Sequence, residues 1–146
     1  MIQLNEECII LELQASNKEE LLRELAIMAQ RNCPEIETTT IIQILLEREQ
    51  VGSTGVGNGV AIPHGKLPDI EEQILCFGKS NKGISFDAKD ERSVHLFVMI
   101  LSPLHMSEKY LQTLGKVSKL LKDEETRNKF LRATSTQTVQ QLFNRP

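Results

Sequence analysis

The sequence predicts one α/β domain. Apolar stretches typical of strands alternate along the chain with stretches at helical spacing, and no linker, internal repeat or low-complexity tract separates them. A length of 146 residues is that of one ordinary domain, 1–146, with a sizeable core. A hydrophobic fraction of 40% and a charged fraction of 25% are typical of soluble globular proteins.

The composition also excludes several classes of protein. No segment approaches the roughly 18 apolar residues of a membrane helix, and the N-terminus lacks the pattern of a signal peptide, so we expect a cytoplasmic protein without membrane insertion. A net charge of −3 and the lack of Trp argue against nucleic-acid binding. The cysteines form no CxxC or Cys/His cluster, which argues against a structural zinc site, and we expect no metal. We also expect no cofactor. Cys8 and Cys76 lie in apolar runs, where a thiol is usually a core residue.

The N-terminal part predicts a strand and a helix. Residues 8–13 (CIILEL) are apolar and begin with β-branched side chains, as in a buried strand. Ser16 and Glu19 have the spacing of a capping box. Apolar residues at helical spacing then predict a helix over 18–31, which Pro34 prevents from continuing.

A second helix is predicted directly before a glycine-rich stretch. Thr38–Thr40 offer its N-cap, and pairs of apolar residues repeat four positions apart along it. The helix should end near Gln50, because Gly52 is a typical C-terminal stop.

The second half of the chain predicts strands and then helices. Residues 73–79 and 94–101 read as strands, and the second is apolar at nearly every position, as in a central strand covered on both faces. A short strand is predicted around 84–86. Helical spacing follows over residues 107–121, 126–133 and 136–143.

The stretch Gly52–Lys66, GSTGVGNGVAIPHGK, holds five of the eight glycines and ends near His64. Backbone N–H groups of glycine-rich loops can face a phosphate. The nucleotide signatures do not fit, however, because a P-loop needs glycine where Val60 stands and the run at 55–59 is GxGxG rather than GxGxxG.

A second interpretation makes this loop a scaffold for His64. Pro63 fixes its own φ and biases Ile62 toward an extended backbone, so the imidazole is presented at the end of a stiff short strand. A neutral imidazole is a competent nucleophile near pH 7 and can carry a phosphoryl group. Arg48 offers a planar cationic fork for phosphate oxygens. Further phosphate donors are predicted in Ser53, Thr54, Gly55 and Asn58.

The residues alone leave three functions open. The first is phosphoryl transfer through His64. The second is a binding module in which His64 is never phosphorylated, because a lone histidine in a glycine-rich loop is more often a polar surface residue. The third is a nucleotide-binding enzyme, which the poor fit to nucleotide signatures disfavours.

The stretch REQVGSTGVGNGVAIPHGK, from Arg48 to Lys66, resembles the active-site signature of the type-2 enzyme IIA domains of the bacterial phosphotransferase system. This is the fructose, mannitol and nitrogen-regulatory group. Residues 83–103 and the helix that begins near Ser107 are similar to the second half of that family. The resemblance implies a mixed parallel and antiparallel β-sheet flanked by helices.

The resemblance also implies a function. In that family the histidine at the position of His64 takes a phosphoryl group from a histidine of HPr or of its nitrogen-branch counterpart. Sugar-transporting members pass the group to a cysteine of a IIB domain, whereas nitrogen-regulatory members bind targets according to their phosphorylation. Because the sequence holds no fused IIB or IIC segment, we expect a regulatory protein, with sugar transport through separate partner chains as the alternative.

The family commonly has a second histidine near the phosphohistidine, and Tyr110 stands at that position here. Its hydroxyl can donate a hydrogen bond to a phosphate, but its ring also fits the apolar stripe of the helix, so core packing is an equal alternative. His105, five residues earlier, is a poor substitute. His95 lies within an apolar strand and is predicted to be structural.

Overall fold

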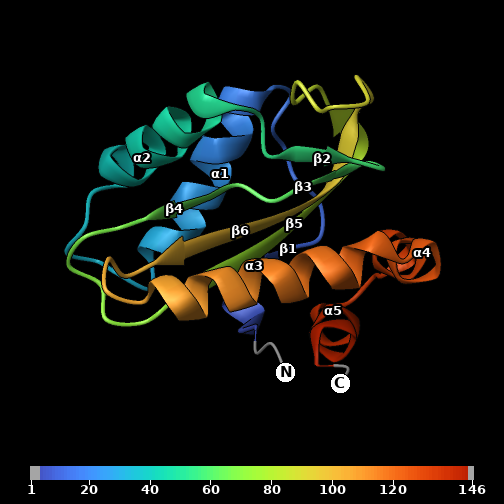
Figure 1. Cartoon of the computed structure of the whole chain (residues 1–146). Coiled ribbons are helices and arrows are strands. Elements are labelled where there is room, and N and C mark those ends of the chain that lie inside the picture. Colours follow the sequence, from blue (N-terminus) through green and yellow to red (C-terminus); the bar gives the residue numbers. More distant parts are fainter. Residues whose placement is uncertain (1–3, 145–146) are drawn as a thin grey trace.

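In the computed structural model of the chain, which describes residues 4–144, helices cover both faces of one β-sheet (Figure 1). The ends of the expected domain, residues 1–3 and 145–146, lie outside the described residues. Among the helices of the described part, none is both long enough and apolar enough to cross a membrane.

The sheet is mixed, with six strands within residues 4–144. β5 and β6 are antiparallel, as are β2 and β3, whereas β1 is parallel to β5, and β3 and β4 are parallel to β6. The sheet type that the resemblance implied is therefore confirmed. Across the sheet the order is β1 (Ile9–Ile10), β5 (Ile74–Ile84), β6 (Val94–Ser102), β3 (Val60–Ala61) and β2 (Gly55–Gly57), and β4 (His64–Lys66) also pairs with β6.

β6 is the centre of this arrangement. β5 runs along one side of it, and β3 and then β4 follow one another along the other side. Residues 96–101 of β6 are at most 1% exposed, which explains their unbroken apolar sequence and confirms the prediction of a central strand.

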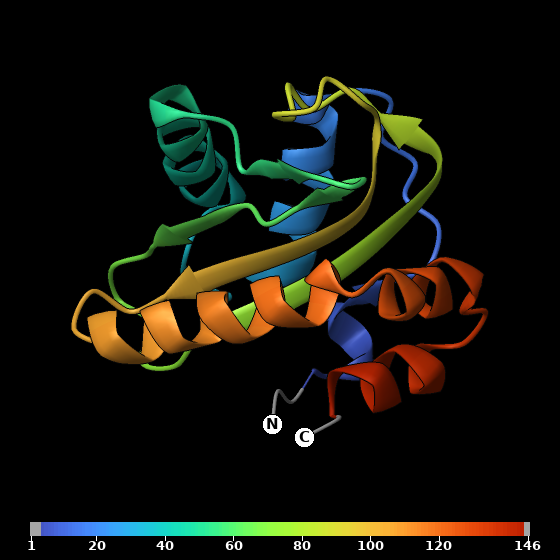
Figure 2. The same cartoon turned by 45° about the vertical axis from the view of Figure 1, so that its right-hand side comes forward.

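Two helical layers enclose the sheet (Figure 2). On one face lie α1 (Lys18–Gln30) and α2 (Thr38–Val51), and on the other lie α3 (Ser107–Lys122), α4 (Glu124–Arg132) and α5 (Thr136–Phe143). The buried side chains of α1 form the stripe that their spacing predicts. All five predicted helices are confirmed, each with ends within two residues of those expected.

The predicted N-caps of the first two helices are wrong. The N-cap of α1 is Asn17, whose side chain accepts a hydrogen bond from Glu20 N at 2.9 Å, and the Glu20 carboxylate accepts one from Ser16 N at 3.0 Å. The capping box is thus shifted by one residue, and asparagine is as strong a cap as serine. α2 begins after Glu37, which makes no side-chain cap bond, so Thr38–Thr40 lie inside the helix.

Two predicted strands also differ from the structure. The stretch 8–13 holds only the two-residue β1, preceded by the 3₁₀-helix η1 (Glu6–Cys8), because its pairing with β5 extends over just two positions. The strands expected over 73–79 and 84–86 are instead one strand, β5, which continues through a register shift to Ile84; Phe86 lies beyond its end.

The glycine-rich stretch is a hairpin rather than an open loop. β2 and β3 pair in antiparallel orientation, and Asn58 and Gly59 form the turn with φ of 59° and 76°. Positive φ at both positions is the geometry of a type I′ turn, for which Asn-Gly is the preferred sequence. β3 precedes His64, as predicted, and His64 itself opens the next short strand, β4.

Candidate functional site

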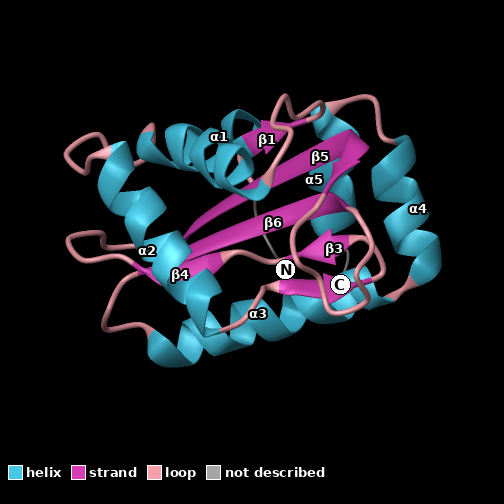
Figure 3. Cartoon of the chain, turned by 90° about the horizontal axis from the view of Figure 1, so that it is seen from above, coloured by secondary structure: helices cyan, strands magenta, loops and turns pink. Residues whose placement is uncertain are grey.

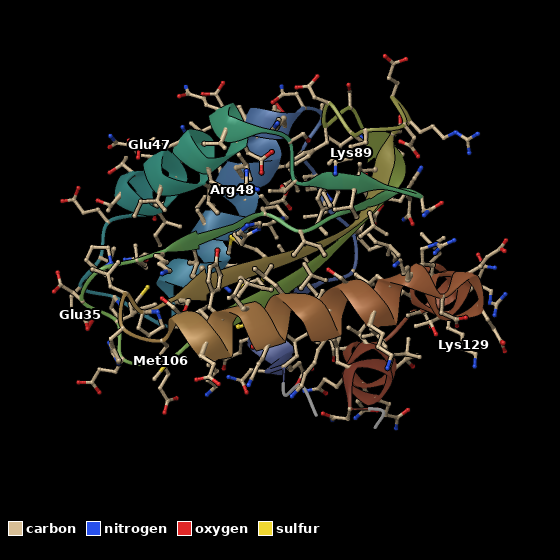
Figure 4. All side chains as sticks on the ribbon, viewed as in Figure 1. Glu35, Glu47, Arg48, Lys89, Met106 and Lys129 are labelled. Carbon is tan, nitrogen blue, oxygen red and sulfur yellow. The ribbon has the colours of Figure 1, made fainter. Side chains whose placement is uncertain are left out.

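His64 lies at an edge of the sheet between helices of the two layers. Seen from above, α2 lies on one side of β4, and α3 lies on the other side (Figure 3). Gly65 permits the close approach of α2, because a Cβ at this position would lie 2.7 Å from Ile44 Cγ2. Arg48 projects from α2 toward the strands (Figure 4).

The orientation of the His64 ring is fixed by its own backbone neighbour. Nδ1 lies 2.7 Å from the carbonyl oxygen of Ile62. Because a carbonyl can only accept, Nδ1 carries the proton, and in the neutral ring Nε2 keeps a free lone pair. Burial lowers the pKa of His64, against the opposing effect of the Ile62 carbonyl, and the charge of Arg48 lowers it further. The neutral, nucleophilic form is therefore favoured.

Tyr110 of α3 contacts His64 directly. The two ring centroids are 5.8 Å apart with an interplanar angle of 61°, an edge-to-face contact. Tyr110 is 9% exposed, and burial raises the pKa of its hydroxyl to about 12, so this group stays protonated. Within the described residues the hydroxyl makes no hydrogen bond to another group. The Tyr110 ring is thus packed in the core, as the packing alternative predicted. It also lies beside His64, as a hydrogen bond from its hydroxyl to a phosphate on His64 requires.

Arg48 brings a positive charge to the site. Nη1 donates to the carbonyl oxygen of Gly52 at 2.8 Å, which holds the side chain across the end of α2. The charge of Arg48 lowers the pKa values of both His64 and Tyr110, so its guanidinium lies within electrostatic reach of both. A guanidinium has five N–H donors, and this bond uses one of them.

The predicted loop donors already have protein partners. Ser53 Oγ donates to Phe86 O at 2.7 Å and accepts from Gly55 N at 3.0 Å. Thr54 is buried, and both its N–H and its hydroxyl donate to the Glu49 carboxylate. These groups therefore shape the segment before β2, and phosphate binding by Ser53, Thr54 and Gly55 stays a prediction.

Asn58 is not brought to His64. It is exposed at the tip of the β2–β3 hairpin, where the carbonyl of Gly59 accepts from Leu96 N. His64 is in register with Ile100, four residues further along β6, which at about 3.3 Å per residue is roughly 13 Å away.

The other two histidines lie outside this site. Nδ1 of His95 hydrogen-bonds to the carbonyl oxygen of Ser80 at 2.8 Å, so the predicted structural role is confirmed. His105 is exposed in the turn between β6 and α3. The three cysteines are free and buried, as predicted for Cys8 and Cys76, and no group of three metal-ligating side chains occurs among residues 4–144.

Two residues near the site were missed from the sequence. Lys66 follows His64 by two positions, so both side chains leave the same face of β4. Its Nζ donates to Ser107 Oγ at 2.6 Å and lies 6.0 Å from the centroid of the Tyr110 ring. Glu49 occupies the buried face of α2, four residues after Leu45, and this helical spacing is a signal that the sequence offered.

Comparisons with known proteins concern the whole chain rather than single residues. The family model "Phosphoenolpyruvate-dependent sugar phosphotransferase system, EIIA 2" matches residues 2–145. A nitrogen regulatory protein of Bradyrhizobium diazoefficiens is 32% identical over 140 residues, which cover 96% of this chain and 91% of that protein. A fructose-specific EIIA component of Haloferax volcanii is 40% identical over 140 residues, with 94% and 89% covered.

Solved structures show the same fold. The crystal structure of nitrogen regulatory protein IIA-Ntr from Neisseria meningitidis superposes with a TM-score of 0.92 at 26% identity, covering 97% of this chain and 96% of that one. The crystal structure of mannitol IIA from Escherichia coli has a TM-score of 0.80 at 23% identity, covering 97% and 99%. Sequence and fold together lead to one conclusion: the chain belongs to the EIIA 2 family of the phosphoenolpyruvate-dependent sugar phosphotransferase system.

Proposed function

We propose that this chain, as one domain over residues 1–146, is a cytoplasmic phosphocarrier that accepts a phosphoryl group on His64. The donor is a phosphohistidine of HPr or of its nitrogen-branch counterpart, and the role is regulatory, of the nitrogen type. The observation that carries the proposal is the 2.7 Å hydrogen bond from His64 Nδ1 to the Ile62 carbonyl, because it leaves Nε2 as the nucleophile.

In the transfer, the Nε2 lone pair forms a bond to phosphorus while the bond from phosphorus to the donor nitrogen breaks. The released electron pair returns to the donor histidine. Nδ1 keeps its proton in this step, so the phosphorylated ring of His64 is formally an imidazolium, and the Ile62 carbonyl that accepts Nδ1–H stabilises its positive charge. Because one N–P bond replaces another, the protein has mainly to align the two nitrogens and stabilise the charge on the transferring group.

Three groups around His64 fit this requirement. Arg48 provides a guanidinium with unused donors, and Tyr110, whose ring contacts that of His64, provides a protonated hydroxyl. Lys66 adds a second cation on the same strand. The added phosphoryl group itself would carry about −1.5 to −2 charges, by analogy with other phosphorylated side chains, which is enough to change what the surface binds.

The regulatory role is supported by the TM-score of 0.92 with IIA-Ntr and by the nitrogen regulatory relatives. A sugar-transport role, in which His64 passes its phosphoryl group to a cysteine of a IIB partner, is the second candidate. It is favoured by the 40% identity with a fructose-specific EIIA component. Mannitol IIA of Escherichia coli has been solved in complex with phosphorylated IIB, although at 22% identity that likeness concerns the fold alone.

The test is to incubate the wild type and His64→Ala with the same phosphorylated carrier and to measure their masses. We expect one phosphate on the wild type, labile in acid and stable in alkali as an N–P bond is, and none on the variant. Equal phosphorylation of the variant, or an acid-stable phosphate on the wild type, would refute the assignment. No phosphate on either protein would favour a binding module, and onward transfer to added IIB would favour sugar transport.

A further inference from the structure

Glu49 is a buried carboxylate directly after Arg48 in the sequence. Its side chain is 4% exposed, and Lys18 Nζ of α1 lies 2.9 Å from Oε1. The same carboxylate accepts from Thr54 N at 3.0 Å and from the Thr54 hydroxyl. One acidic group thus joins the start of α1, the end of α2 and the segment that leads into β2.

The hydrogen bonds continue from this carboxylate to His64. The carbonyl of Thr54 accepts from Ile62 N at 3.0 Å, which extends the β2–β3 ladder one position beyond its last strand pair, Gly55 with Ala61. The carbonyl of Ile62 in turn accepts from His64 Nδ1 at 2.7 Å. A continuous chain of hydrogen bonds therefore runs from Glu49 through Thr54 and Ile62 to the imidazole.

The position of the Ile62 carbonyl decides which ring nitrogen is free. Ile62 lies between β3 and β4, and the next carbonyl along the chain, that of Pro63, accepts from Ile100 N of β6 at 2.9 Å. On the other side of the Ile62 carbonyl, Ile62 N is held by Thr54, and Thr54 is itself held by Glu49. A buried ion pair is weak as a source of stability, so the arrangement is better explained by the geometry it imposes.

We infer that Glu49 is a positioning residue for His64: through Thr54 and Ile62 it holds the carbonyl that accepts Nδ1–H and so keeps Nε2 directed outward as the nucleophile. The effect of Glu49 on phosphoryl acceptance rests on the proposed function, whereas its effect on the His64 tautomer does not. Thr54, expected from the sequence to bind phosphate, becomes a part of this positioning chain.

The direct readout is the tautomer of His64 in the unphosphorylated protein, measured from the ¹⁵N shifts of its ring at a pH well above 6.5. We expect the Nδ1–H tautomer to dominate in the wild type and in Thr54→Ser, which keeps both donors. It should lose population in Thr54→Val, which lacks the hydroxyl, and lose more in Glu49→Ala. If Glu49→Ala does not fold, the comparison of Thr54→Ser with Thr54→Val decides.

A matched control lies at the start of α4. There Thr126 donates through both its N–H and its hydroxyl to the Asp123 carboxylate, the same pairing as in Thr54 and Glu49, and no bond links it to His64. Thr126→Val and Asp123→Ala should reduce stability but leave the His64 tautomer as in the wild type. This control separates an effect of Glu49 and Thr54 on the His64 tautomer from an effect of lower stability of the whole fold.

The kinetic readout is phosphoryl acceptance from the phosphorylated carrier. In Glu49→Ala we expect kcat to fall about 10- to 100-fold, the range for lost orienting partners of histidine ligands in metal sites, with KM for the carrier little changed. A wild-type tautomer in every folded variant of Glu49 and Thr54 would overturn the inference. If the tautomer shifts but the wild type never accepts phosphate, the positioning stands and the proposed function fails.

Discussion

Tyr110→Phe removes one hydroxyl beside His64 and retains the aromatic ring. The edge-to-face contact at 5.8 Å remains, and the hydroxyl makes no hydrogen bond to another described residue, so the free energy of unfolding should change by less than about 1 kcal/mol. A hydrogen bond to a charged group contributes about 1.5–3 kcal/mol. If the hydroxyl donates to phosphoryl oxygen, its loss should shorten the lifetime of phosphorylated His64 by roughly 10- to 150-fold.

Tyr110→Ala is the contrasting change. The side chain is 9% exposed, and a buried aromatic side chain removes about 150–250 Å² from water, which at about 25 cal/mol per Å² corresponds to roughly 4–6 kcal/mol. Alanine keeps the Cβ, so the expected loss is about 3–5 kcal/mol, as for other large-to-small core substitutions.

The assay is to phosphorylate both variants and the wild type with one carrier, to follow loss of phosphate by mass, and to measure unfolding in urea. A Phe variant with the wild-type lifetime and stability would refute the hydroxyl as a phosphate donor. Tyr110 would then be a packing residue alone, despite its contact with His64.

Two further predictions concern the charges of the site. Arg48→Ala should slow acceptance by roughly 10²–10³-fold with the fold intact, and Arg48→Lys should recover little because an ammonium lacks the bidentate fork; unchanged single-turnover kinetics in the alanine variant would remove Arg48 from the site. Because burial lowers the pKa of His64 below 6.5, acceptance should persist below pH 6.5. Between pH 6.5 and the lower pKa of folded His64, the unfolded chain binds a proton at His64 that the folded chain does not. The free energy of unfolding therefore has its full contribution from neutral His64 above pH 6.5 and loses it as the pH falls through this range. His64→Gln should abolish that part of the pH dependence in urea unfolding, and a His64 titration by NMR above pH 6.5 would contradict the reasoning.

The helices could be predicted because a buried stripe is a property of the segment itself. The leucines of α1 repeat at helical spacing whatever else the chain does, and its end was placed within one residue. β3 and β4 are two and three residues long, and the pairing of both with β6 depends on a segment about thirty residues later; Pro63 predicted a short strand before His64, but no local pattern predicted that pairing. The Asn58–Gly59 turn was the one local signal of a hairpin in this stretch.

The site could be predicted only in part, for a related reason. The resemblance placed Tyr110 near His64, whereas the chain of bonds through Glu49 depends on which groups the fold turns inward. Ser53 and Thr54 have the composition of a phosphate loop, but their hydroxyls are engaged by Phe86 and Glu49. A sequence shows which donors are present and not which of them the fold has already paired.

The central place of β6 has a consequence for the order of folding. β3 and β4 join the sheet through β6, which lies later in the chain, and Tyr110 follows later still. Contacts between distant segments close long loops and form slowly compared with helices. A growing chain that ends before residue 94 therefore contains His64 and Arg48 without the strand that aligns β4 or the ring that packs against the imidazole. If His64 accepts a phosphoryl group as proposed, only chains that extend past Tyr110 would hold the complete set of groups around it.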